Sequence, residues 1–168
     1  ESQGGPGIID MVRLIREQSS RAAADERTFL DAVALAWIMA NTDAHAKNYA
    51  MLINYGGHVR LAPLYDLGSA LPYHATLSPH TLKLAMRVGK AYQIQRLGTH
   101  AWDTLARALR LDPIAVRDHL RGLIERIPDA VADVWRQART EGLTHPIVAE
   151  LERGMLAHAV RCSTMLMS

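Results

Sequence analysis

The sequence predicts a mainly α-helical domain that carries one short β-hairpin, at about residues 49–64. Apolar residues recur at helical spacing before residue 40 and again after residue 97. Between these regions, short β-compatible runs flank Gly56-Gly57, which is a strong hairpin signal. At 168 residues, the chain is expected to form a single domain, residues 1–168, with a real hydrophobic core.

The composition is that of an ordinary soluble globular protein, with 49% hydrophobic and 21% charged residues. A formal net charge of +2 does not demand a nucleic-acid or membrane partner. One cysteine, Cys162, rules out an internal disulfide framework and favours a reducing compartment, so we expect a cytoplasmic protein. We find no apolar run of membrane-spanning length and no signal peptide. The chain begins at Glu1 rather than Met, which leads us to expect a fragment of a longer protein.

Two helices are expected before residue 41. After the Gly/Pro-rich stretch ESQGGPG, one apolar face is formed by Ile8, Met11, Val12 and Ile15. The segment QSSRAAADER breaks that pattern, and Thr28 with Asp31 resembles a weak capping box that opens the next helix. The apolar stripe of this second helix consists of Leu30, Val33, Ala34, Trp37 and Ile38. The small side chains of Ala32, Ala36 and Ala40 allow close packing against it.

Beyond an irregular connection at residues 71–80, the rest of the chain is expected to be helical. One helix covers 97–109, and Asp112-Pro113 caps another that runs to about Ile127. Pro128 starts a helix that Gly142 ends, and His145-Pro146 begins a last long one. Core positions are expected for Trp37, Trp102, Trp135 and Cys162.

The hairpin predicts which side chains meet at its open end. With Gly56-Gly57 as a two-residue loop, the numbers of cross-strand partners sum to 113, which pairs Asn48 with Tyr65 and Lys47 with Asp66. A one-residue change in the loop makes the sum 114 and sets Asn48 opposite Asp66. Either register returns Asp66 to the loop that precedes the hairpin, because opposed residues lie about 5 Å apart.

That loop reads NTDAHAKN at residues 41–48, and it contributes Asp43 and Asn48. Mg²⁺ prefers one or two carboxylate or amide oxygens together with water and phosphate oxygens, so Asn48 and Asp66 are candidate metal ligands. Asp43, five residues before Asn48, is placed to accept a proton from a hydroxyl. In protein kinases, a catalytic base is followed along the chain by a metal-binding asparagine, a pair of strands and a metal-binding aspartate. The same order occurs here, with Asp66-Leu67-Gly68 in place of the kinase sequence Asp-Phe-Gly.

Other interpretations of these residues remain open. The loop can simply link helix to hairpin, with Asp43 capping backbone N–H groups and Lys47 pairing with Asp66, since such residues are common in loops. The returning Asp66 favours function over this alternative. A small metallohydrolase that uses Asp43, His45 and Asp66 is a third possibility, although none of the eight histidines has the spacing of a zinc site.

Four segments, GGPGI, NTDAHAKN, GGHVRLAPLYDLGSA and LKLAM, together resemble the C-terminal helical lobe of HipA-like serine/threonine kinases, the toxins of bacterial toxin–antitoxin pairs. The resemblance covers nearly the whole chain and implies a protein-kinase-like C-terminal lobe. It implies that Asp43 is the proton acceptor and that Asn48 and Asp66 bind the metal. It further implies nucleotide contacts, which fall on His45, Lys47 and Tyr65.

By the same resemblance, the cofactors are ATP and Mg²⁺, and the γ-phosphoryl group passes to a Ser or Thr hydroxyl of a protein. The target it suggests lies in translation, with an aminoacyl-tRNA synthetase as the example, and the partner is a helix-turn-helix antitoxin that alone contacts DNA. A phosphate-contacting patch at Arg117, Arg121, Arg136 and Arg139 is less expected than a solvated, ion-paired face.

A working kinase also needs a glycine-rich phosphate loop and a strand lysine before the catalytic loop. Only 42 residues precede Asp43 and none is a lysine, so the N-terminal nucleotide-clamping lobe is expected to be absent from this chain. We therefore expect the isolated chain to have negligible kinase activity. The alternative function is a non-catalytic helical interaction module that binds an antitoxin.

Overall fold

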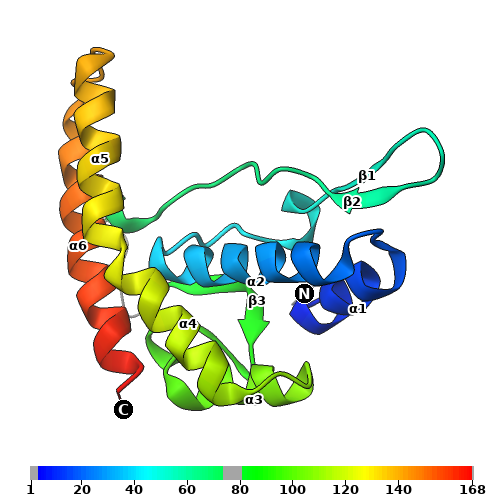
Figure 1. The fold of residues 1–168 in the computed structure, drawn as a ribbon. Helices are drawn as coiled ribbons and strands as arrows, with labels where there is room; N and C mark the ends of the chain where they lie inside the picture. Colours follow the sequence, from blue (N-terminus) through cyan, green and yellow to red (C-terminus); the bar gives the residue numbers. More distant parts are fainter. Residues whose placement is uncertain (1–3, 74–80, 168) are drawn as a thin grey trace.

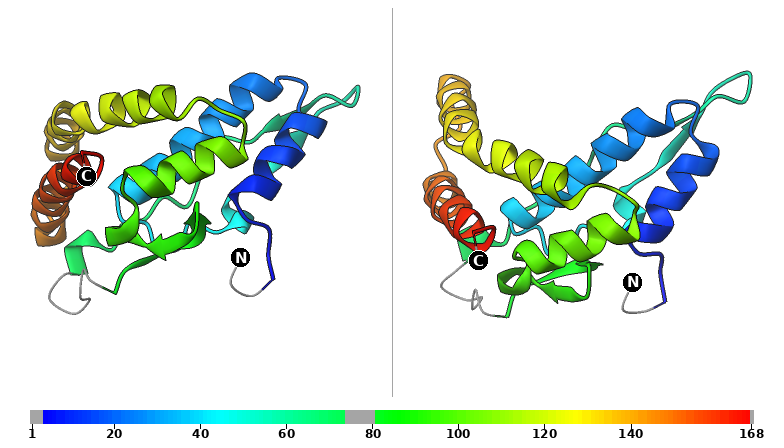
Figure 2. Two further views of the ribbon diagram at one scale, coloured as in Figure 1. Left: turned by 90° about the horizontal axis from the view of Figure 1, so that it is seen from below. Right: turned by 60° about the horizontal axis from the view of Figure 1, so that its bottom comes forward.

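The structure, a computed structural model, describes residues 4–73 and 81–167. It is mainly helical, and its described part contains two small antiparallel hairpins. Figure 1 shows α2 (Ala22–Ile38) running through the middle of the molecule beside α1 (Ile8–Gln18). In both views of Figure 2, the first hairpin projects at one end, and the antiparallel helices α5 (Ile127–Thr140) and α6 (Pro146–Met165) stand at the other.

The start of α2 differs from the expectation. The helix begins at Ala22, so the capping box predicted at Thr28 is wrong. Thr28 lies inside the helix, where its Oγ1 donates to the carbonyl of Ala24 over 3.1 Å. Residues 22–24 are all alanine, and such a run favours a helix without providing any large apolar side chain. The periodicity of large residues therefore becomes visible only after the helix has begun.

The end of α2 is a sharp turn at Ala40. The sequence pattern predicts Ala40 as part of the helix, but this residue lies beyond the last helical residue, fully buried and with a positive φ of 50°. The N–H of Asn41 donates back to the carbonyl of Ala36 over 2.8 Å, which closes the helix in the manner of a Schellman motif. The chain thus leaves α2 in a fixed direction just before the NTDAHAKN loop.

The first hairpin joins β1 (Met51–Ile53) to β2 (Val59–Leu61) with a register that neither sequence alternative predicts. Leu52 lies opposite Arg60, so the partner numbers sum to 112 rather than 113 or 114. The loop comprises Tyr55 to Gly57, closed by a 2.9 Å bond from the Asn54 N–H to the carbonyl of His58. Positive φ angles of 93° and 79° at Gly56 and Gly57 explain why two glycines stand there.

The second hairpin was not expected, and the prediction that only helices follow residue 80 is wrong. It joins β3 (Lys83–Val88) to β4 (Ala91–Gln93), and its buried residues are Leu84, Met86 and Val88. Residues 74–80, most of the predicted irregular connection, lie outside the described residues, whereas Leu71–Tyr73 form a 3-10 turn, η2.

The later helices confirm the prediction to within about two residues. They are α3 (Thr99–Ala108), α4 (Pro113–Glu125), α5 and α6, and Asp112 caps α4 by accepting from the N–H of Ile114 over 3.0 Å. The three tryptophans and Cys162 are buried, as expected. Within the described ranges, we find no helix long and apolar enough to cross a bilayer.

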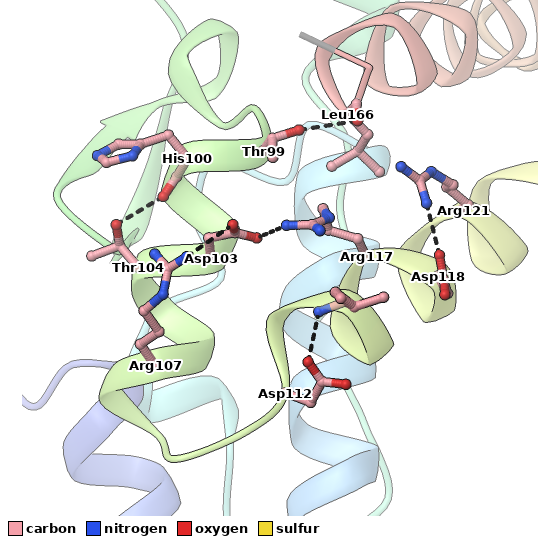
Figure 3. Close-up of polar contacts among 11 residues, drawn as sticks. Thr99, His100, Asp103, Thr104, Arg107, Asp112, Arg117, Asp118, Arg121 and Leu166 are labelled. Atoms are coloured by element: carbon pink, nitrogen blue, oxygen red, sulfur yellow. Dashed lines mark hydrogen bonds and ion pairs between the residues drawn. The ribbon is translucent and has the colours of Figure 1, made fainter.

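Ion pairs account for Arg117 and Arg121 on α4 and for Arg136 on α5. Arg121 pairs with Asp118 and Arg136 with Asp133, which confirms the expected ion-paired face. Arg117 instead points inward, and its Nη1 lies 2.5 Å from Oδ1 of Asp103 (Figure 3). This contact joins α4 to α3, so Arg117 has a structural role.

Candidate functional site

Two backbone hydrogen bonds hold the candidate site together from its two ends. At the strand ends, the N–H of Ala62 donates to the carbonyl of Ala50 over 2.8 Å. At the end of α2, the N–H of Ala70 donates to the carbonyl of Ala40 over 3.1 Å. The loop 41–48 and the segment 63–69 run between these bonds, so we call them the two arms of the site.

Asn48 and Asp66 meet between the arms. Nδ2 of Asn48 donates to Oδ2 of Asp66 over 2.8 Å and to the backbone carbonyl of Asp43 at 3.3 Å. Asn48 is only 6% exposed and ends a 3-10 turn, η1 (Ala46–Asn48). The predicted convergence of Asn48 and Asp66 is therefore confirmed, although the register that was to produce it is different.

The backbone of Asp66 is in the left-handed region, with φ of 57°. Aspartate enters this region more readily than most residues, but the conformation still costs about 1–2 kcal/mol. Such a residue persists where its surroundings hold it, often at a functional position. Here the conformation accompanies the contact between the carboxylate and Asn48.

The remaining oxygens of this pair fit a hard cation. Within the described part of the chain, no donor reaches Oδ1 of Asn48 or Oδ1 of Asp66. A carboxamide and a carboxylate oxygen suit Mg²⁺, which takes water and phosphate oxygens for its other positions. Clusters of three His, Cys, Asp or Glu side chains suited to a metal do not occur among residues 4–73 and 81–167, so the set Asp43, His45 and Asp66 is not assembled.

Asp43 points away from the protein. Its side chain is 81% exposed, and Oδ1 lies 3.8 Å from Nε2 of His45. The backbone, not the carboxylate, holds the residue in place, because the N–H of Asp43 donates to Oδ1 of Asn41 over 3.0 Å. None of the described N–H groups donates to the Asp43 carboxylate, so the capping role in the linker alternative is not observed. The carboxylate is open to an incoming hydroxyl.

The other candidate residues lie on both arms, His45 and Lys47 on the loop 41–48 and Tyr65 on the segment 63–69. The hydroxyl of Tyr65 donates to the carbonyl of Lys47 over 2.7 Å, which ties the two arms at their middle. Lys47 itself is exposed and, among the described residues, forms no ion pair, so the proposed pairing with Asp66 is not found. Nδ1 of His45 is buried without a described hydrogen-bond partner.

Two further residues shape the site and were not predicted. Asn41 is 4% exposed and fixes Asp43, and an asparagine two residues before an aspartate is a recognisable Asx-turn signal. Ser69 donates through Oγ to the carbonyl of Met39 over 2.6 Å and accepts from the N–H of Leu71 at 3.2 Å. No local pattern marks Ser69, because its partner lies 30 positions away.

Comparison with known families identifies the chain. The family model described as HipA-like C-terminal domain matches residues 1–135. The chain belongs to this family. A Sinorhizobium fredii protein named "Putative kinase Y4mE" is 37% identical over 133 residues, covering 79% of this chain and 30% of the relative. A Haemophilus influenzae "Putative kinase" is 25% identical over 76 residues, covering 45% of this chain and 22% of that protein.

The HipA-like fold extends past residue 135. In a complex of the Shewanella oneidensis MR-1 toxin–antitoxin proteins HipA and HipB with operator DNA, the matched chain has a TM-score of 0.81 and 21% identity. The match covers 96% of this chain and 37% of that one, so most of α6 belongs to the shared fold. This chain spans less than two-fifths of the length of each of these relatives.

Proposed function

We propose that this chain supplies the catalytic residues of a HipA-like serine/threonine protein kinase, which transfers the γ-phosphoryl group of ATP to a protein hydroxyl. The observation that carries the proposal is the 2.8 Å contact of Asn48 with Asp66 beside an exposed Asp43 on the same loop. Membership of a family whose relatives are named as kinases agrees with it.

In this reaction, the carboxylate of Asp43 accepts the proton of the attacking Ser or Thr hydroxyl. Its exposure allows a protein substrate to approach, and the hydrogen bond from its N–H to Asn41 keeps the loop in place. Asn48 and Asp66 would hold Mg²⁺ through their free oxygens. A magnesium ion held there would supply positive charge to the phosphates of ATP, and charge stabilisation of this kind provides most of the catalytic effect in such transfers.

Lys47 is exposed and directly precedes Asn48, and its ammonium adds positive charge for the transferring phosphoryl group. His45 and Tyr65 complete the nucleotide contacts, and Tyr65 also fixes the backbone of Lys47. The segment before Asp43 forms α1 and α2 and contains no lysine. We therefore place the groups that clamp ATP in another part of the protein and expect this chain alone to show negligible transfer.

For partners, we propose a helix-turn-helix antitoxin, with DNA reached only through it, and a protein substrate. The support is the likeness to HipA in a complex with HipB and operator DNA. An aminoacyl-tRNA synthetase as substrate and a cytoplasmic location rest on the family resemblance and on the single cysteine, respectively.

The test uses a chimaera in which this chain replaces the matching region of the Sinorhizobium fredii relative. We expect the chimaera to transfer label from γ-labelled ATP to protein, and Asp43→Asn to lower the rate about 10²-fold or more with little change in KM for ATP. Asp118→Asn, which alters an exposed ion pair on α4, is the control and keeps the parental rate. An Asp43→Asn chimaera as active as its parent would refute the proposal.

A further inference from the structure

Helix α6 contacts the two elements next to which the arms of the candidate site begin or end, namely the end of α2 and η2. It packs against the C-terminal half of the chain and also against α2 and η2. Its residues Gly154 and His158 are four positions apart, so they lie on the same helical face. His158 contacts the end of α2, and Gly154 contacts η2.

His158 contacts the end of α2, from which the arm 41–48 departs. The side chain is 5% exposed, and its Nε2 lies 3.1 Å from the carbonyl oxygen of Trp37. A carbonyl only accepts, so Nε2 carries the proton and donates. The same carbonyl accepts the N–H of Ala40 over 3.1 Å. His158 therefore supports the turn from which the loop to Asp43 departs.

Gly154 contacts Leu71 in η2, two residues beyond the arm 63–69 that contains Asp66. A Cβ at this position would lie 2.8 Å from Cβ of Leu71, which is closer than packing allows. Only glycine lets the helix backbone come so near. Leu71 follows Ala70, whose N–H donates a hydrogen bond to the carbonyl of Ala40.

The turn at Ala40 needs such support. An alanine with φ of 50° is in the left-handed region, which costs about 1–2 kcal/mol and is kept only where neighbouring contacts enforce it. The contacts are the hydrogen bonds from Ala70 to Ala40 and from Ser69 to Met39, together with His158 on Trp37. Asp43 follows only three residues later, so relaxation of the turn displaces its carboxylate.

We propose that His158 is a positioning residue for phosphoryl transfer, which acts by holding the Ala40 turn through the Trp37 carbonyl. Gly154 assists by allowing α6 to pack closely against Leu71. The inference rests on the proposed function for its catalytic consequence, whereas the predicted effect on the loop itself does not. It gives α6, all of which lies outside the region matched at residues 1–135, a role in the site.

The kinetic test compares His158→Leu with His158→Gln in the chimaera. Leucine cannot donate to Trp37, and we expect kcat to fall about ten- to hundredfold with KM for ATP within about twofold, because a misplaced catalytic group costs turnover. Glutamine carries an N–H donor at the position of Nε2, and it restores most of kcat. The control is Cys162→Ala, a fully buried change on α6, which lowers the melting temperature but not kcat.

A second readout uses hydrogen exchange on the 168-residue chain and needs no activity. In His158→Leu, amides of residues 39–48 exchange about tenfold faster or more, while those of α4 do not change. The inference is overturned if exchange there equals that of the parent chain, if Cys162→Ala accelerates it equally, or if glutamine rescues no better than leucine. If His158→Leu does not fold, the test uses Gly154→Ala instead. In that variant we expect the amides of residues 66–73 to exchange faster than in the parent chain. Exchange equal to that of the parent chain would overturn the inference.

The two proposals fail separately. If Asp43→Asn leaves the chimaera fully active, the proposed kinase function is wrong, and the exchange at residues 39–48 still tests His158. If Asp43→Asn abolishes transfer while His158→Leu keeps the parental kcat, the kinase function stands and the positioning role is wrong.

Discussion

Nδ2 of Asn48 lies 2.8 Å from Oδ2 of Asp66, although the two residues are 18 positions apart in the sequence. The intervening chain is the β1–β2 hairpin, which returns the second arm to the first. The hairpin thus converts two short polar segments into one site with a carboxamide, a carboxylate and an adjacent exposed aspartate. The stability of that arrangement depends on how the hairpin is anchored to the helices.

Asp25 is the anchor of β2. The residue is 5% exposed, and its Oδ2 accepts from Oγ of Ser19 at 2.6 Å and from the N–H of Leu61 at 2.7 Å. We predict that Asp25→Ala lowers the free energy of unfolding by about 2–3 kcal/mol, because it leaves a buried N–H without an acceptor. Urea denaturation measures the loss. Asp118→Ala, on an exposed ion pair, is the control at about 0.5 kcal/mol or less, and equal losses would contradict the anchoring role.

Two glycines should respond to alanine in opposite ways. Gly89 has φ of 59°, and a Cβ there would lie 2.5 Å from the carbonyl oxygen of Ala101. Gly122 lies in α4 with no atom within 4 Å of a Cβ. We predict that Gly89→Ala destabilises the fold by about 2 kcal/mol or more, whereas Gly122→Ala stabilises it by up to about 1 kcal/mol. Thermal melting of both variants checks this, and a neutral Gly89→Ala would show that β3–β4 does not pack on α3 as described.

His158 should make stability depend on pH. Burial lowers the pKa of His158 to about 4; the hydrogen bond to Trp37 opposes this shift, and Arg161 adds to it. Because the unfolded chain binds the proton near pH 6.5, the stabilising effect is complete above that pH and is lost as the pH falls toward about 4. The largest loss from this group is about 3 kcal/mol.

The measurement is the free energy of unfolding of the parent chain and of His158→Gln at pH 7 and pH 4.5. Other titrating groups are shared, so the difference between the two proteins isolates His158. We expect the parent chain to lose more stability than the variant on acidification. Parallel losses would show that His158 is not held neutral by burial.

Most helices could be predicted because their large apolar residues repeat at helical spacing, as in α1 and α4. The start of α2 could not, since alanines carry no such signal. The β3–β4 hairpin was missed although Leu84, Met86 and Val88 alternate with polar or small residues. Leu, Met, Ala and Lys are also good helix formers, so the local sequence does not decide between the two structures, and the packing of β3 on α1 and α3 is not visible in it.

The site could be predicted in part. The meeting of Asn48 and Asp66 follows from any hairpin centred near Gly56-Gly57, so an error in register did not affect it. The contribution of α6 could not be foreseen, because His158 and Trp37 are 121 positions apart. Local sequence contains the reactive groups, whereas their support comes from distant parts of the chain.

The most direct test of the account is a double-mutant cycle on phosphoryl transfer by the chimaera, with Asn48→Ala, Asp66→Ala and the double variant. If the two residues hold one ion, each single change removes most of the transfer rate, and the double variant is no worse than about the poorer single one. Losses that multiply in the double variant, or single variants that keep the parental rate, would contradict a shared metal site at Asn48 and Asp66.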